Sequence, residues 1–350
     1  MPLGRPVVED GVTFWYFRRQ TRFYTGSLPL SRWLAGHATD YDLIHLHALF
    51  SFSTTAAAFW AVRRGVPYVV RPLGTLNTWG IENRRPWLKQ LSMRLIERRV
   101  LAKAVAVHFT STQERDEAQL VAPCARGFVI PNPVVAKGVR QEAQVAEFLT
   151  RHPEIVRRRI VLFLSRLDPK KGLDVLLQAF AKVRAMGSDA ALVIAGDGEP
   201  GFVRTLKAEA ENLGVAKHVI WTGFVDGEEK WAVLAAADVF VLPSYSENFG
   251  IAVVEATAYG LPVIVSNQVA IHREIAEAFA GLVVHCDAGE TAGAILRMLE
   301  DEELRSRLAR NALALADRFK PEAVTKRLVR QYHELLSIKR LEDATAYSRR

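Results

Sequence analysis

Cysteine is scarce in this sequence. The 350 residues include two cysteines, Cys124 and Cys286. A disulfide-stapled scaffold needs more cysteines than that, and no C-x-x-C pair or Cys/His cluster indicates a zinc site. The cysteine content therefore favours a protein of the reducing cytoplasm and excludes the small disulfide-rich classes.

Long apolar runs are missing too. No uninterrupted apolar stretch approaches the ~18 residues that a transmembrane helix needs. The start of the chain, MPLGRPVVEDGV, lacks the apolar segment of a signal peptide. We therefore expect the protein to be made and kept in the cytosol.

Acidic residues are outnumbered by basic ones. Lysine and arginine total 46 against 38 acidic residues, which gives a net charge of +8. Such a balance suits an anionic partner: a nucleotide, an anionic lipid surface or a nucleic acid. A nucleic-acid role rests on net charge alone, so we expect none.

The sequence alternates short apolar runs with amphipathic helical stretches, and continuous Val/Ile/Leu runs are typical of buried parallel strands. This alternation predicts an α/β fold with doubly wound parallel sheets. The expected strands of a first series are Thr13–Phe17, Asp42–His47, Pro67–Arg71, Val105–Thr110 and Phe128–Ile130. Those of a second series are Ile160–Ser165, Ala191–Ala195, His218–Trp221, Val239–Leu242, Pro262–Val265 and Leu282–Val284.

A break separates the two series. Pro131-Asn132-Pro133 ends the first, and a polar stretch from about Lys137 to Arg159 precedes the second. We expect a first domain over 1–150, a second over 155–320, and a final helix over 321–340 that returns to the first domain.

Polar residues follow the first strand of the second series, and ligands of open α/β sheets lie beyond the carboxyl ends of the strands. Arg166 and Lys171 flank a turn that ends in Gly172 and opens a helix. Two cations beside a helix N-terminus form a site for a pyrophosphate. The alternative is a surface loop with ordinary basic residues.

The next two strand ends carry weaker signals. Gly196-Asp197-Gly198 follows Ala191–Ala195, and it either brings backbone close to a ligand or forms a plain tight turn. Phe224 follows the next strand, where its ring either holds a nucleobase or belongs to the core.

The segment after Val239–Leu242 is the most informative. Glu247 lies in a loop, and a helix is expected to begin near Phe249-Gly250 with free N–H groups that face an anion. Glu255 lies within an apolar helical stretch, where a carboxylate is costly unless it has a partner. A ribose diol is one such partner; a buried salt bridge is the alternative.

Taken together, these segments resemble the retaining family 4 ("group 1") glycosyltransferases. The matching features are Ser-Arg-Leu-x-x-x-Lys-Gly at 165–172, Gly-Asp-Gly at 196–198, and two glutamates eight positions apart at 247 and 255. The resemblance extends from about Gly11 to Leu336. It implies a GT-B fold, in which two Rossmann-like domains face a cleft.

The resemblance also implies a role for each matching residue. Arg166 and Lys171 would bind the donor diphosphate and stabilise it as it leaves, Glu247 would contact the donor hexose, and Glu255 would hold the ribose. The remaining donor-side residues would be Gly196, Asp197, Gly198, Phe224, Asn248, Phe249 and Gly250. Preorganised cations and amides can stabilise the leaving charge, so no metal or other cofactor is expected. Asp40-Tyr41-Asp42 resembles a metal-binding motif, but we interpret it as a turn before a strand.

Two departures from the family pattern concern the first domain. Leu73 stands where family members often carry a histidine that touches the donor sugar, and His45 and His47 are alternatives at a neighbouring strand end. The usual first strand, glycine-rich loop, helix and second strand have no counterpart before Val12, so we expect an incomplete first domain and slow or absent transfer.

A basic stretch in the first domain has two interpretations. Arg84 to Lys103 carries seven cations with apolar residues interleaved. Such a helix binds an anionic membrane surface, which would place the protein peripherally on the inner membrane face. The alternative is an ordinary helix whose cations face solvent and whose apolar residues belong to the core.

The sequence thus predicts an enzyme that moves a hexose from a UDP- or GDP-sugar to a glycan or lipid-linked acceptor, with retention, in surface polysaccharide synthesis. Two rivals stay open: an epimerase or phosphorylase of the same fold, and a non-catalytic remnant that binds nucleotide-sugars.

Overall fold

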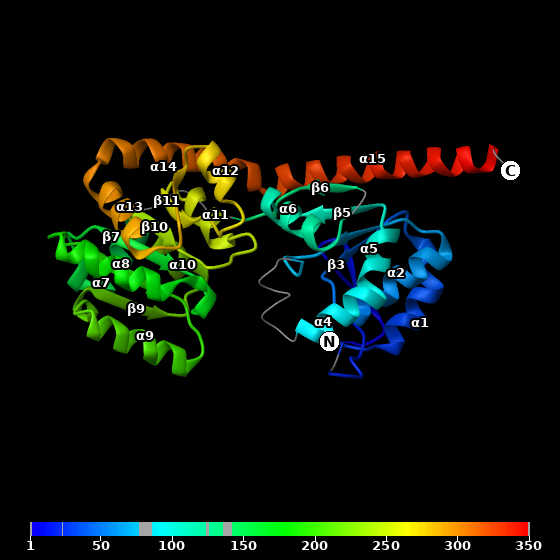
Figure 1. The fold of residues 1–350 in the computed structure, drawn as a ribbon, viewed down its shortest axis with the longest axis horizontal. Helices are drawn as coiled ribbons and strands as arrows, with labels where there is room; N and C mark the ends of the chain where they lie inside the picture. The colour runs from blue at the N-terminus through cyan, green and yellow to red at the C-terminus, as the bar shows by residue number, and fades with distance from the viewer. Residues whose placement is uncertain (1, 23, 77–85, 124–125, 136–141, 349–350) are drawn as a thin grey trace. The chain divides into compact units, whose positions relative to one another are not determined.

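The chain folds into two α/β units, which we describe separately. The computed structural model describes residues 2–22, 24–76, 86–123, 126–135 and 142–348. The first unit comprises Met1–Ile130 and Lys326–Arg350, and the second comprises Pro131–Thr325 (Figure 1). The expected α/β class with two parallel sheets is confirmed.

The second unit is a six-stranded parallel sheet with helices packed around it. Its strands are β7 (Ile160–Leu164), β8 (Ala191–Ala195), β9 (Val219–Gly223), β10 (Val239–Leu242), β11 (Val263–Ser266) and β12 (Gly281–Val284), in the spatial order β12-β11-β10-β7-β8-β9. Each matches an expected strand. β7, β8 and β10 are fully buried, which is why they are continuous apolar runs in the sequence.

The helices of the second unit pack in neighbouring pairs: α8 with α9 and α13, α7 with α10, and α11 with α14. Their bounds are α7 (Glu142–Arg151), α8 (Leu173–Ala185), α9 (Pro200–Asn212), α10 (Gly227–Ala236), α11 (Ile251–Ala258), α12 (His272–Glu277), α13 (Ala288–Glu300) and α14 (Glu302–Ala316). Side chains such as Phe163, Phe180 and Phe240 are fully buried in the resulting core.

The boundary between the units differs from the one expected near residue 150. Val134 and Phe148 are buried in the core of the second unit, and α7 packs against α10. The stretch is mostly polar, but a few apolar side chains lie on one face of α7 and pack into the core. The stretch therefore belongs to the second unit.

The first unit contains a four-stranded parallel sheet of order β3-β4-β5-β6. The strands are β3 (Ile44–His47), β4 (Tyr68–Arg71), β5 (Ala106–Phe109) and β6 (Gly127–Val129). The helices are α1 (Leu28–His37), α2 (Phe52–Arg64), α4 (Pro86–Ser92), a π-helical turn Met93–Glu97, α5 (Arg98–Lys103), α6 (Thr112–Val121) and α15 (Pro321–Ser348), of which the part from Lys326 onward belongs to this unit. No helix in the described part of the chain is long and apolar enough to cross a membrane.

One expected strand of this unit takes a different role. Thr13–Phe17 was expected in the parallel sheet, but β2 (Val12–Trp15) pairs antiparallel with β1 (Pro6–Glu9) in a separate two-stranded hairpin. Three of the four β2 residues are exposed. The run is apolar enough for a buried strand, but a tight turn at Asp10-Gly11, both with positive φ, folds it back on β1.

α15 packs against one face of this sheet, where a histidine cluster lies. Leu335 packs against Val69 and Ala106, and the Tyr332 hydroxyl lies 2.6 Å from His45 Nδ1. His45 Nε2 lies 3.4 Å from His108 Nδ1, and His108 Nε2 donates to the Ile130 carbonyl at 2.7 Å. The geometry fits two neutral imidazoles, each with one donating nitrogen and one accepting nitrogen.

This cluster predicts loss of stability in acid. Burial, and next the charges that His47, His108 and Arg71 would place beside it, lower the pKa of His45 from 6.5 to about 3. Burial and the nearby Arg71 lower the pKa of His108 from 6.5 to about 4, although its hydrogen bond to the Ile130 carbonyl acts in the opposite direction. The unfolded chain takes up these protons below about pH 6.5, whereas the folded chain does not. The free energy of unfolding should therefore decrease from about pH 6.5 to about pH 4, by up to about 1.4 kcal/mol per pH unit for each histidine.

Urea unfolding at pH 7, 6 and 5 measures this dependence. A double variant, His45→Asn with His108→Asn, should lose less stability between pH 7 and pH 5 than the parent does. His333→Asn, an exposed position on α15, is the matched control and should retain the parent's slope. An unchanged slope in the double variant would contradict the assignment.

Candidate functional site

The residues singled out in the second unit gather at the centre of its sheet. β7 and β10 are adjacent, and the chain proceeds outward from β7 through β8 and β9 on one side and from β10 through β11 and β12 on the other. The strand order reverses between them, and the crevice at such a point is where open α/β sheets bind ligands.

The loop after β7 holds the first cations. Asp168 caps a short 3-10 turn, Pro169–Lys171, by accepting from the Lys170 N–H at 3.1 Å. Gly172 follows with φ +68°, and a Cβ there would lie 2.0 Å from the Pro243 carbonyl oxygen. The glycine thus lets the β7 and β10 loops touch. It also lets α8 begin beside β10.

Lys171 and Glu247 form an ion pair between these two loops. The side chains are 7% and 14% exposed, so the pair is largely withdrawn from water. Arg166 differs, because it is exposed and none of the residues that the structure describes pairs with it. An anion that enters this site would therefore meet the unpaired Arg166 guanidinium and the Lys171 ammonium, which is already paired with the Glu247 carboxylate.

Lys170 is a further cation at this loop, and the sequence interpretation passed over it. Burial, and next the neighbouring Lys171 ammonium, lower the pKa of the Lys170 amine. The signal in the sequence was its position between Asp168 and Lys171. Its backbone carbonyl accepts from the Tyr245 N–H at 2.8 Å, which adds a second tie between the loops.

The N-terminus of α11 faces the same strand ends. Gly250, with φ +87°, is the N-cap and supplies no side-chain acceptor. The first amides of a helix have no partner within it, and they carry partial positive charge. Phe249 is buried and Asn248 half-buried, so the backbone here is fixed by packing. The loop is held further by Glu247, whose N–H and carbonyl bond Gln268 and Ala270.

Glu255 has a protein partner in the structure. Its Oε1 accepts from Lys230 Nζ of α10 at 2.7 Å, and the two side chains are 12% and 24% exposed. The ammonium also lies 4.3 Å from the centroid of the Trp231 ring. The costly carboxylate is therefore paired by a salt bridge without any ligand. No local pattern in the sequence joins Lys230 to Glu255, which is why the pairing was missed.

The glycines at 196–198 are explained by packing between loops. A Cβ on Gly196 would lie 1.9 Å from the Ser165 carbonyl oxygen, and one on Gly198 would lie 2.2 Å from that of Leu167. The Leu167 N–H donates to the Asp197 carbonyl at 2.9 Å. These glycines bring two loops together and so position Arg166, whatever else they contact.

Phe224 is not a core residue. It is 71% exposed and follows β9 directly, at the carboxyl edge of the sheet. An exposed aromatic ring at this edge is free to stack on a planar group.

The first unit places its candidate residues at the carboxyl ends of β3 and β4. Ala48, Phe50 and Leu73 all have positive φ, which is uncommon for such residues and concentrates at functional loops. Leu73 is 39% exposed, and the next N–H, of Gly74, donates to the buried carboxylate of Glu114 at 2.6 Å. His45 belongs to the cluster with Tyr332 described above, and His47 is exposed beside it.

Across the described residues, no three His, Cys, Asp or Glu side chains are placed to hold a metal ion. Asp40 ends a 3-10 turn and Asp42 lies just before β3, both exposed. They lie at the amino end of that strand, opposite the edge where ligands of such sheets bind.

Two family models match the chain. "Glycosyl transferases group 1" matches residues 146–314, and "Glycosyl transferase 4-like domain" matches residues 2–133. Together they cover both units. The group 1 match includes all four charged residues of the candidate site: Arg166, Lys171, Glu247 and Glu255.

Individual relatives agree with the models. The chain is 29% identical over 310 residues to a phosphatidyl-myo-inositol mannosyltransferase of Mycobacterium leprae, covering 86% of this chain and 75% of the relative. It is 31% identical over 247 residues to an alpha-D-kanosaminyltransferase of Streptomyces kanamyceticus, covering 68% of this chain and 63% of the relative.

Solved structures show the same fold. Sucrose-phosphate synthase from Thermosynechococcus elongatus superposes with a TM-score of 0.76 at 22% identity, covering 95% of this chain and 86% of that one. Anabaena Alr3699/HepE, solved in complex with UDP and glucose, gives a TM-score of 0.73 at 21% identity, covering 92% and 86%.

Proposed function

Since the chain belongs to the group 1 glycosyltransferases of GT-B fold, we propose that it transfers a hexose from a UDP- or GDP-sugar to an acceptor hydroxyl with retention. The observation that carries the proposal is the set of cations and free amides at the switch point of the second sheet. The bond from the anomeric carbon to the β-phosphate oxygen breaks and negative charge develops on the departing nucleoside diphosphate. A bond to the acceptor oxygen forms, and the acceptor hydroxyl gives its proton to the departing phosphate.

Arg166, Lys171 and the α11 amides are proposed to receive that charge. Arg166 is exposed and unpaired among the described residues, so it is free to meet a phosphate. Lys171 must exchange its Glu247 partner for the diphosphate, and this exchange releases the Glu247 carboxylate toward the donor hexose. Asn248, Phe249 and Gly250 would contribute backbone amides, which stabilise developing charge without reorganisation.

Glu255 is proposed to bind the ribose diol by a similar exchange, with Lys230 as the resting partner. Gly196, Asp197 and Gly198 would shape the phosphate side of the crevice, and Phe224 would stack on the base. The exposed Phe224 ring and the close loop contacts of the glycines support these assignments.

The Glu255→Ala variant should weaken nucleoside binding about 10- to 100-fold, because it removes charge-assisted hydrogen bonds to the diol. The fold should persist, since Lys230 remains partly exposed to water. Calorimetric titration of the nucleoside measures the loss. If Glu255→Ala and Lys230→Ala lower the melting temperature alike and leave nucleoside affinity unchanged, the pair is structural only.

The acceptor is proposed to be a glycan or a lipid-linked hydroxyl of surface polysaccharide synthesis. A Mycobacterium leprae relative is named a phosphatidyl-myo-inositol mannosyltransferase, and α4 and α5 of the first unit carry an excess of cations that suits an anionic membrane. The first unit's strained loops at Ala48, Phe50 and Leu73 are proposed to line the acceptor side.

A panel of nucleotide-sugars tests the proposal in two steps. A donor at a hundred times its dissociation constant adds about 2.7 kcal/mol of stability, which a thermal shift detects. Donors that shift the melting temperature are then assayed for release of nucleoside diphosphate with glycan and lipid acceptors. Binding without release favours the non-catalytic rival, and no binding by any donor would contradict the proposal.

A further inference from the structure

An apolar pocket opens on the first unit between α2 and the segment from the π-helical turn into α5. Its volume is about 470 Å³. Three large apolar side chains at its wall are exposed: Phe59 by 55%, Val62 by 41% and Leu95 by 53%. Tyr68 and Val100 lie buried at its floor. An exposed concave apolar surface of this size is typical of a ligand site.

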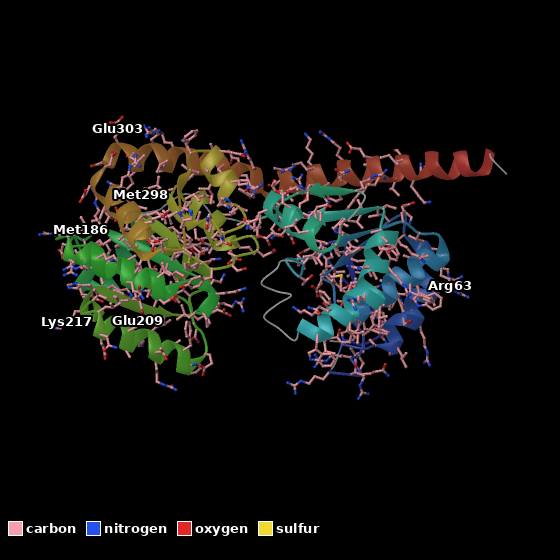
Figure 2. All side chains as sticks on the ribbon, viewed as in Figure 1. Arg63, Met186, Glu209, Lys217, Met298 and Glu303 are labelled. Carbon is pink, nitrogen blue, oxygen red and sulfur yellow. The ribbon has the colours of Figure 1, made fainter. Side chains whose placement is uncertain are left out.

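The rim of this pocket carries only positive charge. Arg63, Arg99 and Lys103 line it, and no acidic residue does. Figure 2 labels Arg63 near the end of α2. None of the three cations forms an ion pair with any residue in the described ranges. Unpaired cations around an apolar hollow are complementary to a ligand with an anionic end and a hydrocarbon body.

A second hollow adjoins the pocket at Lys103, one of the rim cations that an anionic end would meet. It has a volume of about 590 Å³ and shares Val62, Tyr68 and Lys103 with the first. Arg126 and Lys339 also line it. The second hollow is more polar than the first, and Lys103 lies where the two meet.

We propose that these joined hollows bind one acyl chain of a phosphate-bearing lipid. The chain occupies the apolar pocket along Phe59, Val62 and Leu95, and the phosphate lies against Lys103 and Arg99. Burial of methylene groups in the apolar pocket favours the acyl chain, and the cations select the anionic head. The site is formed by the first unit alone and depends on none of the donor-site residues. Because it uses cations of α5, it rests on the lipid-linked acceptor proposed above, whereas donor binding does not depend on it.

Calorimetric titration with lysophosphatidic acid, below its micelle-forming concentration, tests the site on the full chain. The parent should bind one equivalent. Val62→Trp should fill the pocket, and Arg99→Glu should repel the phosphate; each should weaken binding at least tenfold. Arg98→Glu is the matched control, because this neighbouring residue lines a different hollow, and it should change affinity less than about threefold.

The remaining outcomes distinguish the sources of binding. Equal losses in Arg98→Glu and Arg99→Glu would show diffuse attraction to charge and overturn the site. Equally tight binding of zwitterionic lysophosphatidylcholine would overturn the role of the cations, and equally tight binding of inorganic phosphate would overturn that of the pocket. Absence of binding to the parent would refute the proposal outright. Thermal melting of each variant verifies that it is folded, and Arg99 is exposed, so its variant should fold.

Discussion

Arg166→Ala and Lys171→Ala should each lower kcat by about 10²- to 10³-fold, the usual cost of removing one preorganised donor from a developing negative charge. Arg166 is exposed and has no partner among the described residues, so it is free to meet the proposed diphosphate, and Lys171 ends the short 3-10 turn that leads into α8. Steady-state release of nucleoside diphosphate from the donor identified by the panel measures the effect.

Lys217→Ala is the control for this pair. Lys217 is an exposed lysine that precedes β9, at the amino edge of the same sheet, and Figure 2 labels it. Its variant should retain the parent's kcat. A loss of similar size in Lys217→Ala, or a loss below about threefold in Arg166→Ala, would contradict the role assigned to these cations.

Glu247→Gln should separate binding from turnover. The substitution removes the carboxylate that neutralises Lys171 in the free protein, so the nucleoside diphosphate should bind as tightly as to the parent, or more tightly. Transfer should nevertheless decrease about 10²- to 10⁴-fold, because the carboxylate proposed to face the hexose is lost.

Titration of nucleoside diphosphate and the release assay, performed on the same preparation, measure both quantities. Asp168→Asn is a useful comparison, because it changes the charge of a loop residue that caps the turn. If Glu247→Gln weakens diphosphate binding as much as it lowers kcat, Glu247 acts by holding the loop, and its assignment to the hexose is incorrect.

Much of the second unit could be predicted from the sequence because its strands are buried on both faces. A buried strand such as Val239–Leu242 must be apolar throughout, so its position is visible without any structure. The functional loops follow from the same argument, since residues directly after a parallel strand lie at its carboxyl edge. Arg166 and Glu247 were located in this way.

The first unit was predicted less well, for a physical reason. Thr13–Phe17 has strand composition, but composition does not say which partner a strand pairs with. Here the turn at Asp10-Gly11 selects an antiparallel neighbour.

The expected helix 321–340 extends as α15 to Ser348, because its polar end is as compatible with a solvated helix as with a loop. Arg84 and Arg85 of the expected basic helix lie outside the described residues, and the remainder is interrupted by a π-helical turn.

Pairings between distant residues were not accessible from the sequence. Lys171 with Glu247 and Lys230 with Glu255 each join two elements that only the fold brings together. The sequence indicated that a buried carboxylate needs a partner, but it did not indicate which residue is that partner. The sequence therefore placed the candidate residues at the strand ends, but it did not show which ion pairs they form in the absence of a ligand.

The most direct test of the account compares the affinities of a nucleoside diphosphate and its parent nucleoside for the double variant Arg166→Ala with Lys171→Ala. Calorimetric titration should show the diphosphate weakened by about 10²- to 10⁴-fold, at about 1.5–3 kcal/mol for each lost charged contact, and the nucleoside changed by less than about threefold. Equal weakening of the two ligands, or none, would contradict a diphosphate site at the ends of β7 and β10.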